Sequence, residues 1–289
     1  RLQVEHPVTE MVTGLDLVEL MVLIAANKCG NLKDLNISIS GASMEARLYA
    51  ENPLRDFRPS PRIMTDVEFP TWARIDTWIE KGTVVSPEYD PTLAKIIVHG
   101  KDRAEALAKL NAALQETKVY GCITNIEYLK SIASSQMFNE VKISTNILNS
   151  YDFTLNALEI VTPGAHTSIQ DYPGRNGYWR IGVPPSGPMD SYSFRLANRI
   201  VGNSPTAAAI EVTLLGPAIK FHFDTVIGLA GGSVSCTIND IAIKQYEPVQ
   251  VHRGDVLNIG KLTTGCRVYL AIRGELDIPN YLGSKSTFT

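Results

Sequence analysis

Hydrophobic positions follow two different periods along the chain, and the change falls near residue 150. Before it, residues 15–28, 101–118 and 124–135 have helical patterns. Residues 15–28 (LDLVELMVLIAANK) are apolar on almost every side, which predicts a helix buried on several faces. Residues 92–100 (TLAKIIVHG) predict a strand. We therefore expect the first half to mix helices with short strands.

The segment 101–118 has the clearest amphipathic pattern. Its apolar residues gather on one face of a helix: Ala106, Leu107, Leu110, Ala113 and Leu114. The other face carries Glu105 and Lys109, which are four residues apart and can pair. In the next helical segment, Thr124 and Glu127 have the spacing of a capping box.

After residue 155 the pattern is mostly β. Short β-branched or aromatic runs are separated by Gly, Asp, Asn or Pro, for example TVIGLAGG (225–232), SVSCTIND (233–240), VLNIG (256–260) and CRVYLAIRG (266–274). This spacing is typical of a sandwich or barrel. One helix interrupts it at residues 191–201, with Asp190 as its cap and Gly202 as its stop. We predict an α+β chain whose halves, 1–150 and 157–289, are joined by a polar linker at 151–156.

Composition narrows the classes of partner. The 289 residues fit about two domains, and 44% hydrophobic with 20% charged residues is ordinary for globular proteins. A net charge of −3 and a pI near 6.0 argue against a nucleic-acid partner. No apolar run approaches the ~18 residues of a membrane-spanning helix. The four cysteines have no paired spacing, which favours reduced thiols in the cytoplasm over disulfides or a metal site.

The first five residues alternate in a way that points to chemistry. On an extended strand, Arg1, Gln3 and Glu5 would face one side, and Leu2 and Val4 the other. A guanidinium, an amide and a carboxylate on one face can hold a small oxyanion and remove its proton. An exposed strand face with a salt bridge is the alternative.

The segment RLQVEHPVTEMVTGLDLVE (1–19) resembles the biotin carboxylase motif of biotin-dependent carboxylases. The resemblance continues through SMEARLYAENP (43–53), SPEYDPTLAKIIVHGKDRAEAL (86–107) and VYGCITNIEYL (119–129). It implies the C-terminal part of an ATP-grasp biotin carboxylase domain over residues 1–150. That family's Gly-rich lid, ATP-binding lysines and acidic metal ligand precede this motif, and the chain has no Met-Lys-Met biotinylation sequence. We therefore expect an internal fragment that by itself neither binds MgATP nor carries biotin.

The resemblance also implies residue roles. In that family the Arg and Gln of the motif hold bicarbonate and the Glu is its general base. Arg1 and Gln3 would then be ligands, together with the backbone of Val4, and Glu5 the base. The family's second arginine falls on Arg47, whose implied role is to stabilise negative charge on the biotin oxygen. Deprotonated bicarbonate would attack the γ-phosphate of ATP, so the implied cofactors of the full-length enzyme are biotin, ATP and Mg²⁺.

The second half resembles another family. Residues 163–203, 209–221 and 267–289 resemble the carboxyltransferase domain of urea carboxylase, which is related to one of the components of 5-oxoprolinase and to kinase-inhibitor-associated proteins. The resemblance implies a cyclophilin-like β-barrel, present here only in its first part. A biotin carboxylase followed directly by this domain is typical of urea carboxylases, and in particular of the fungal urea amidolyases.

Urea is neutral and planar, so its site needs hydrogen-bond acceptors and donors. The polar candidates within the resembling segments are Gln170, Asp171, Arg175, Tyr178, Ser186, Asp190 and Glu211. Asp190 has a competing role as a helix cap, and Asp171 can instead hold a turn together with Arg175.

The function implied is biotin-dependent conversion of urea, bicarbonate and ATP to allophanate. The biotin carrier domain of the same polypeptide would be the partner. One alternative is a carboxylase for another amide or a guanidine-like acceptor, and a second is a non-catalytic binding module. We expect a cytoplasmic protein with neither a nucleic-acid nor a membrane partner.

Overall fold

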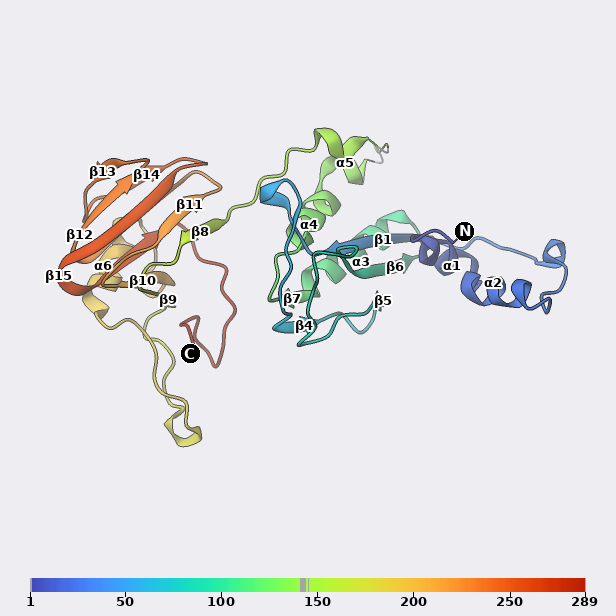
Figure 1. Ribbon diagram of the computed structural model, residues 1–289, viewed down its shortest axis with the longest axis horizontal. Coiled ribbons are helices and arrows are strands. Elements are labelled where there is room, and N and C mark those ends of the chain that lie inside the picture. The colour runs from blue at the N-terminus through green and yellow to red at the C-terminus, as the bar shows by residue number, and fades with distance from the viewer. Residues whose placement is uncertain (1, 141–143, 145, 289) are drawn as a thin grey trace. The chain divides into compact units, whose positions relative to one another are not determined.

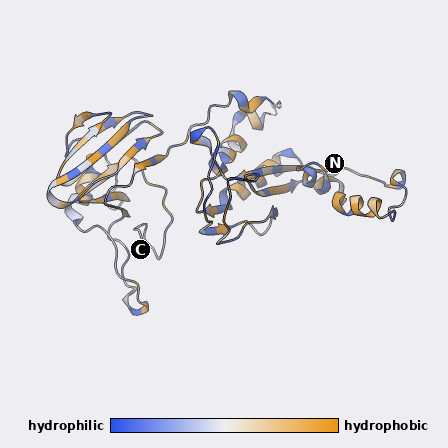
Figure 2. Ribbon diagram, viewed as in Figure 1, coloured by the Kyte–Doolittle hydropathy of each residue, from blue (hydrophilic) through white to orange (hydrophobic). Residues whose placement is uncertain are grey.

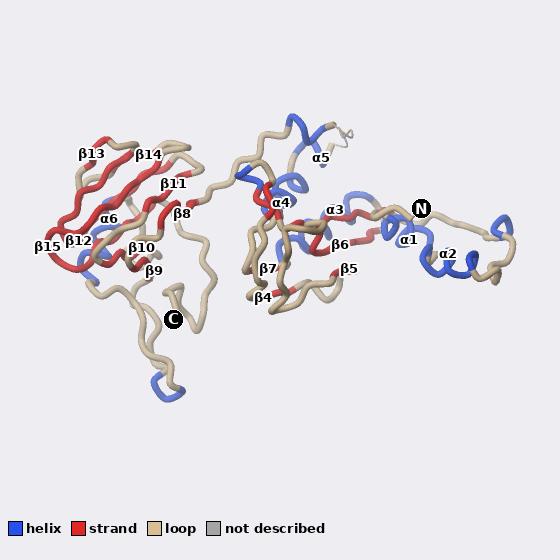
Figure 3. Tube along the Cα trace, viewed as in Figure 1, coloured by secondary structure: helices blue, strands red, loops and turns tan. Residues whose placement is uncertain are grey.

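The computed structural model describes residues 2–140, 144 and 146–288. The chain divides into two compact units, residues 1–153 and 154–289. Helices are concentrated in the first unit and strands in the second, as Figure 3 shows. Each unit has a hydrophobic core of its own.

The first unit has these helices and 3-10 turns: α1 (His6–Thr13), α2 (Leu17–Ala25), η1 (Leu32–Asp34), η2 (Pro53–Arg55), α3 (Arg103–Glu116), α4 (Ile126–Ser134), α5 (Gln136–Asn139) and η3 (Ile147–Ser150). Its strands are β1 (Ala42–Tyr49), β2 (Glu51–Asn52), β3 (Arg58–Pro59), β4 (Asp66–Glu68), β5 (Arg74–Thr77), β6 (Thr92–Gly100) and β7 (Lys118–Tyr120). Three of these strands form an antiparallel sheet in the order β1-β6-β5 (Figure 1).

This sheet has one apolar face and one charged face. Met44 and Ala46 of β1 lie on the apolar face with Ile96 and Val98 of β6, against the buried side of α3. The predicted helix and strand are confirmed, and all five apolar residues expected on the inner face of α3 are buried. The expected pair of Glu105 and Lys109 also forms, at 2.8 Å.

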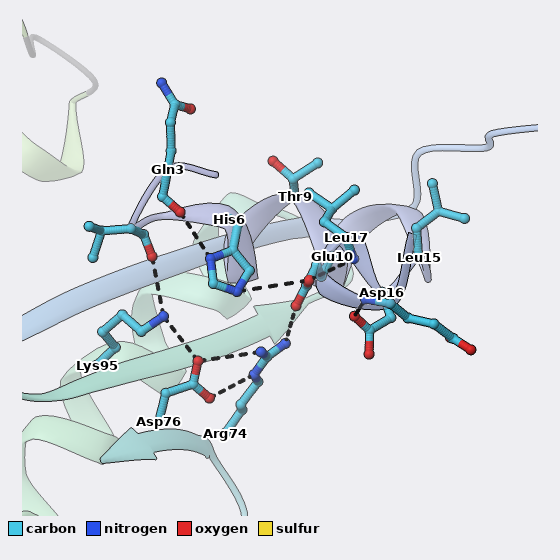
Figure 4. A network of polar contacts seen from close by, with 12 residues as sticks. Gln3, His6, Thr9, Glu10, Leu15, Asp16, Leu17, Arg74, Asp76 and Lys95 are labelled. Carbon is cyan, nitrogen blue, oxygen red and sulfur yellow. Dashed lines mark hydrogen bonds and ion pairs between the residues drawn. The ribbon is translucent and has the colours of Figure 1, made fainter. Parts of the chain in front are cut away.

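Side-chain alternation collects charged residues on the other face. Arg47 of β1 is directly opposite Lys95 of β6, which is directly opposite Asp76 of β5. Residues opposite one another in a sheet share a face, and so do residues two apart in one strand. Glu45 and Arg74 therefore join this face, and α1 lies against it (Figure 4).

Three local predictions differ from the structure. Residues 2–5 form no strand but a turn into α1, with Glu5 as its N-cap. None of the residues of α2 is buried, because the helix extends away from the sheet (Figure 1). The capping box is also wrong: Asn125 is the N-cap of α4, and Glu127 pairs with Lys130.

The second unit contains η4 (Trp179–Ile181) and one α-helix, α6 (Ser191–Ile200). Its strands are β8 (Leu158–Thr162), β9 (His166–Gln170), β10 (Ala209–Thr213), β11 (Ala218–Phe221), β12 (Thr225–Ile238), β13 (Ile241–Ile243), β14 (Val249–Val251) and β15 (Val256–Ile272). They form one curled, half-barrel sheet of eight strands built around β12 and β15.

The two long strands each pair with different neighbours at their two ends. One edge of β15 pairs with β11 near Leu257 and with β10 near Val268. β12 joins two runs that the sequence pattern separated, and β15 likewise spans two. Gly231 allows the irregular register in β12, because its φ is +130° and a Cβ there would lie 2.6 Å from the carbonyl oxygen of Arg267.

Alternation along β15 builds two cores. Val268, Leu270 and Ile272 face the larger core inside the curled sheet, whereas Tyr269 and Ala271 face α6. Figure 2 shows alternating apolar and polar residues along these strands. The predicted helix is confirmed: Asp190 accepts hydrogen bonds from the backbone amides of Tyr192 and Ser193.

No helix within the described part of the chain is both long enough and apolar enough to cross a membrane.

Candidate active site

The turn that precedes α1 lines a cavity of ≈ 660 Å³ together with residues of α1 and α2 and one strand residue. Gln3, Val4, Glu5 and Arg47 are among its lining residues. Arg1 lies outside the described residues. The cavity thus contains four of the five first-half residues singled out in the sequence, although the turn is not the extended strand that alternation predicted.

Arg47 is the centre of charge in this cavity. Its Nη2 donates a hydrogen bond to Oε2 of Glu5 over 2.6 Å, and its Nε lies 3.5 Å from Oε1 of Glu45. The two carboxylates differ in exposure: the Glu5 side chain is 52% exposed and that of Glu45 only 4%. Burial raises the pKa of Glu45, and the nearby charges of Lys95 and Arg47 oppose this rise. Arg47 therefore has one fixed and one accessible acidic partner.

A chain of ion pairs connects the turn to the sheet beneath it (Figure 4). Lys95 donates a hydrogen bond from Nζ to the carbonyl oxygen of Val4 over 3.2 Å, and the same Nζ lies 3.0 Å from Oδ2 of Asp76. Arg74 pairs with Asp76 at 3.0 Å and with Glu10 at 2.8 Å. The charged face of the sheet thus holds both the turn and the helix that follows it.

Glu10 explains how α1 remains in place. Although it is acidic it is buried, and its Oε1 accepts a hydrogen bond from the backbone amide of Leu17 over 2.8 Å. His6 lies 3.9 Å from the same oxygen, and its ring Nδ1 lies 2.9 Å from the carbonyl oxygen of Gln3. A buried carboxylate costs free energy unless it is paired. Here the pairing partners fix both ends of the helix.

Sequence reasoning missed Asn125. Its amide group donates to the carbonyl oxygen of Arg47 over 3.1 Å and accepts from the amide of Tyr49 over 2.8 Å. It therefore fixes the backbone of β1 at the arginine. Sequence reasoning also missed Lys95, Asp76 and Glu45. For Asp76 and Glu45, the alternation of charged residues along β5 and β1 was a usable signal.

In the second unit, Arg175 is almost completely buried, and it has no carboxylate partner among the residues that the structure describes. Its Nε donates to the carbonyl oxygen of Tyr281 over 3.0 Å, and its Nη2 to that of Ser286 over 2.8 Å. The guanidinium also lies over the rings of Tyr281 and Phe288, 5.1 and 5.3 Å from their centroids. Ser186, another candidate, accepts a hydrogen bond from the Arg175 backbone amide over 3.0 Å. Arg175 therefore attaches residues 281–288 to the base of a long loop.

Asp171 holds the same segment. The pair with Arg175 that the turn hypothesis expected does not form. Its carboxylate accepts hydrogen bonds from the hydroxyls of Ser284 and Ser286 and from the backbone amide of Lys285. Burial alone would raise the pKa of Asp171, but these hydrogen bonds outweigh it and the pKa lies below its ordinary value. The carboxylate is thus already fully engaged within the chain.

Gln170 closes the loop from its other side. Its Oε1 accepts a hydrogen bond from the Gly187 amide over 3.0 Å, and its Nε2 donates to the Ser168 hydroxyl over 3.0 Å. The two legs of the loop touch at Gly174, where a Cβ would lie 2.0 Å from the carbonyl oxygen of Ser186. Tyr178 stands near the far end of the loop, just before η4, which projects away from the sheet in Figure 1.

Asp190 and Glu211 are linked by Tyr269, a residue that the sequence pattern did not single out. The Tyr269 hydroxyl donates to Oε2 of Glu211 and accepts from the Asp190 amide, both over 2.8 Å. Glu211 also accepts from the Met189 amide over 2.9 Å and pairs with Arg267 at 3.4 Å. Burial is the largest of the effects that raise the pKa of Tyr269. Six of the seven candidates, all but Tyr178, thus hold the loop between residues 171 and 190.

Over the residues that the structure describes, no three His, Cys, Asp or Glu side chains are grouped so that they could hold a metal ion.

Three protein families match parts of the chain. Residues 1–33 match the ATP-binding domain of the carbamoyl-phosphate synthase L chain, and residues 45–150 the biotin carboxylase C-terminal domain. Residues 181–289 match the carboxyltransferase domain, subdomains A and B. Together with the fold, these matches define a biotin-dependent carboxylase segment.

Whole-chain comparisons are more specific. The urea amidolyase of Saccharomyces cerevisiae is 68% identical over 289 residues, which is 100% of this chain and 16% of the yeast protein. The crystal structure of Kluyveromyces lactis urea amidolyase matches 99% of this chain and 17% of that one, with 66% identity and a TM-score of 0.90. Over its whole length, the chain is therefore similar to a segment of urea amidolyases.

A more distant structure shares the first unit. The biotin carboxylase domain of Hydrogenobacter thermophilus 2-oxoglutarate carboxylase, solved with MgADP, ADP and bicarbonate, is 32% identical. It covers 54% of this chain and 36% of that one, with a TM-score of 0.51.

Proposed function

We propose that the cavity at the start of α1 binds bicarbonate and removes its proton. The observation that carries this proposal is the 2.6 Å pair of Glu5 and Arg47 at a cavity also lined by Gln3 and Val4. An amide, a carboxylate and a guanidinium around one cavity supply the donors that an oxyanion needs and the base that its hydroxyl needs. A relative of the first unit was solved with bicarbonate, which supports this choice of anion.

Each residue then has a defined task. Gln3, together with Arg1, would hold the oxygens of bicarbonate, and Glu5 would accept its proton. Arg47 would be released from Glu5 as Glu5 gains that proton, which leaves a cation free beside the new anion. A preorganised cation next to developing negative charge is the most effective form of electrostatic catalysis.

The residues fit biotin better than they fit a metal ion. Arg47 is one-third exposed, and its guanidinium can turn from Glu5 toward the ureido oxygen of biotin. When bound, biotin would carry the carboxyl group to the second site. We assign Mg²⁺ and the phosphates of ATP to parts of the full-length enzyme that precede the biotin carboxylase motif, where the family resemblance places their ligands.

For the full-length protein we propose ATP-dependent carboxylation of urea to allophanate, with biotin on a carrier domain of the same polypeptide. The chain spans about one-sixth of the length of the amidolyases that it matches, 16% in yeast. We assign residues 1–150 to the biotin carboxylase domain, 151–156 to a linker, and 157–289 to a cyclophilin-like carboxyltransferase domain. The four free cysteines agree with a cytoplasmic location.

We assign the urea site to the loop between residues 171 and 190, with Tyr178 as the candidate whose side chain the loop contacts do not use. The other candidates, including Gln170, Arg175 and Glu211, would shape the site by holding this loop. Functional residues often lie on loops that a rigid scaffold positions.

The test is bicarbonate-dependent ATP hydrolysis by a full-length protein that contains this chain. Urea, guanidine, acetamide and an acyl-CoA would be compared as acceptors. We expect stimulation by urea alone. Stimulation by another acceptor and not by urea would contradict the urea assignment. No stimulation by any acceptor would favour a binding role for the second unit.

A further inference from the structure

The turn that carries the proposed bicarbonate ligands has no regular secondary structure of its own. Residues 2–5 form neither helix nor strand, so their positions depend on contacts made to the rest of the unit. One such contact is the pair of Glu5 and Arg47, which the proposed reaction itself must open. A second set of contacts is therefore needed to keep the turn in place while that pair is broken.

Lys95 provides such a contact from the sheet below. Its side chain is only 13% exposed, and its Nζ bonds the carbonyl oxygen of Val4. That carbonyl belongs to the peptide unit that joins Val4 to Glu5. Because a peptide unit is planar, fixing its oxygen also fixes the direction in which the chain leaves toward Glu5.

Lys95 is itself held by Asp76. The Asp76 carboxylate is shared between Lys95 at 3.0 Å and Arg74 at 3.0 Å, and Arg74 continues to Glu10 in the middle of α1. Burial raises the pKa of Asp76, but the hydrogen bonds from Arg74 and Lys95 more than offset this, so the carboxylate stays ionised at neutral pH. The lysine is thus locked between a fixed anion and the backbone of the turn.

We propose that Lys95 is a positioning residue for bicarbonate: it holds the Val4 carbonyl so that Gln3 and Glu5 keep their places when Arg47 lets go of Glu5. This inference rests on the proposed function of the same cavity. It assigns to Lys95 no contact with the reacting atoms. Its effect should therefore fall on the use of bicarbonate and not on the other substrates.

The test compares Lys95→Met with Lys95→Arg in a full-length protein that contains this chain. Methionine keeps the length and apolar stem of lysine but has no donor, whereas arginine retains the charge and can reach both partners. We expect kcat/KM for bicarbonate to fall roughly 10- to 100-fold in Lys95→Met, since small misplacements of reacting groups have effects of this size. The KM for ATP should stay within about twofold, and Lys95→Arg should recover part of the loss.

Lys118→Met is the matched control. Lys118 forms an exposed pair with Glu68 at 2.9 Å in the separate sheet of β4 and β7, so the same substitution should leave bicarbonate kinetics unchanged. An unchanged kcat/KM for bicarbonate in Lys95→Met would overturn the proposal. So would an equal loss for bicarbonate and ATP, which would indicate a general structural effect. If the unsubstituted protein has no bicarbonate-dependent ATP hydrolysis, the proposed function fails instead.

Discussion

Arg47 has two acidic neighbours that differ mainly in exposure. The pair with Glu5 is open to solvent, and such pairs contribute only about 0–1 kcal/mol. An incoming anion can therefore take the place of Glu5 beside the guanidinium at little cost. The buried carboxylate of Glu45 has no such freedom, and it keeps Arg47 on the charged face of the sheet. The exposed Glu5 can therefore exchange its partner, whereas the buried Glu45 holds Arg47 in place.

Replacing either member of the exposed pair should stop the chemistry of the first unit. In a full-length protein that contains this chain, we expect Glu5→Gln and Arg47→Ala each to lower biotin carboxylation at least about 100-fold, the scale of a lost general base. Carboxylation would be measured with radiolabelled bicarbonate. Allophanate hydrolysis, measured as ammonia release, should be unaffected where a hydrolase is fused to the carboxylase.

Glu19→Gln on α2 is a suitable control, because Glu19 is an exposed glutamate outside the cavity. It should retain normal carboxylation. Near-normal carboxylation in both Glu5→Gln and Arg47→Ala would show that the roles assigned to this pair are wrong.

The contact between these two residues could not be derived from spacing. Glu5 and Arg47 are 42 positions apart, and only the family resemblance connected them in the sequence. Gln3 and Glu5 do line one cavity, but they lie on a turn, so the extended strand that alternation predicted was wrong. The residues that hold the turn and β1 come from β5, β6 and α4, and pairing between distant segments is not encoded in any local pattern.

At the scale of elements, periodicity succeeded where an element packs within its own unit. α3 buries the face that its pattern predicted, and β6 forms the predicted strand, because the two pack against each other within one core. It failed for α2, whose apolar residues Val18, Met21, Val22 and Ile24 are exposed. A periodic pattern reports that a face is apolar, but not what covers it.

At the scale of elements, residues 281–288 form no regular helix or strand and are held by hydrogen bonds to the Asp171 carboxylate. The free energy of unfolding should therefore depend on pH. Asp171 has a lowered pKa, so its stabilising contribution is complete above about pH 3.9, the ordinary value for aspartate. It should be lost as the pH falls through the lowered pKa. Asp171→Asn should reduce the free energy of unfolding by about 1–2 kcal/mol at pH 7.

This difference should shrink as the pH falls through the lowered pKa of Asp171, because the unsubstituted protein then also loses the charge. Urea unfolding of the chain at pH 7 and at a series of pH values descending from about 3.9 would measure it. Asp277→Asn, at an exposed aspartate, is the control and should have little effect at either pH. A penalty for Asp171→Asn that is as large in acid as at neutral pH would contradict the charge argument.

On the scale of the whole molecule, the change of hydrophobic period near residue 150 matched the division into two units. The pattern did not predict that the eight-stranded sheet of the second unit is curled. β12 and β15, of 14 and 17 residues, read as separate short strands because glycines interrupt their apolar runs. In the structure, these glycines lie within continuous strands and do not end them.

Separate cores predict separate effects of core substitutions. Leu114 is fully buried in the first unit, so Leu114→Ala should cost about 2–5 kcal/mol there. Hydrogen-exchange mass spectrometry should show faster exchange in α3, β1 and β6, with β12 and β15 unchanged. Ile219→Ala, in the core of the second unit, should give the reverse pattern. Loss of protection in both units from either substitution would contradict their independence.

The shared face of β1, β6 and β5 has a consequence for how this segment can change over time. The five charged residues share the face toward the turn and α1 only because each occupies the matching alternate position along its strand: Glu45, Arg47, Lys95, Arg74 and Asp76. A point substitution alters one of them, but inserting or deleting a single residue within β6 would turn Lys95 toward α3 and bring Ile96 under the turn. Related sequences that keep these contacts can therefore carry substitutions along these strands. Insertions or deletions between the paired positions, however, must add or remove an even number of residues.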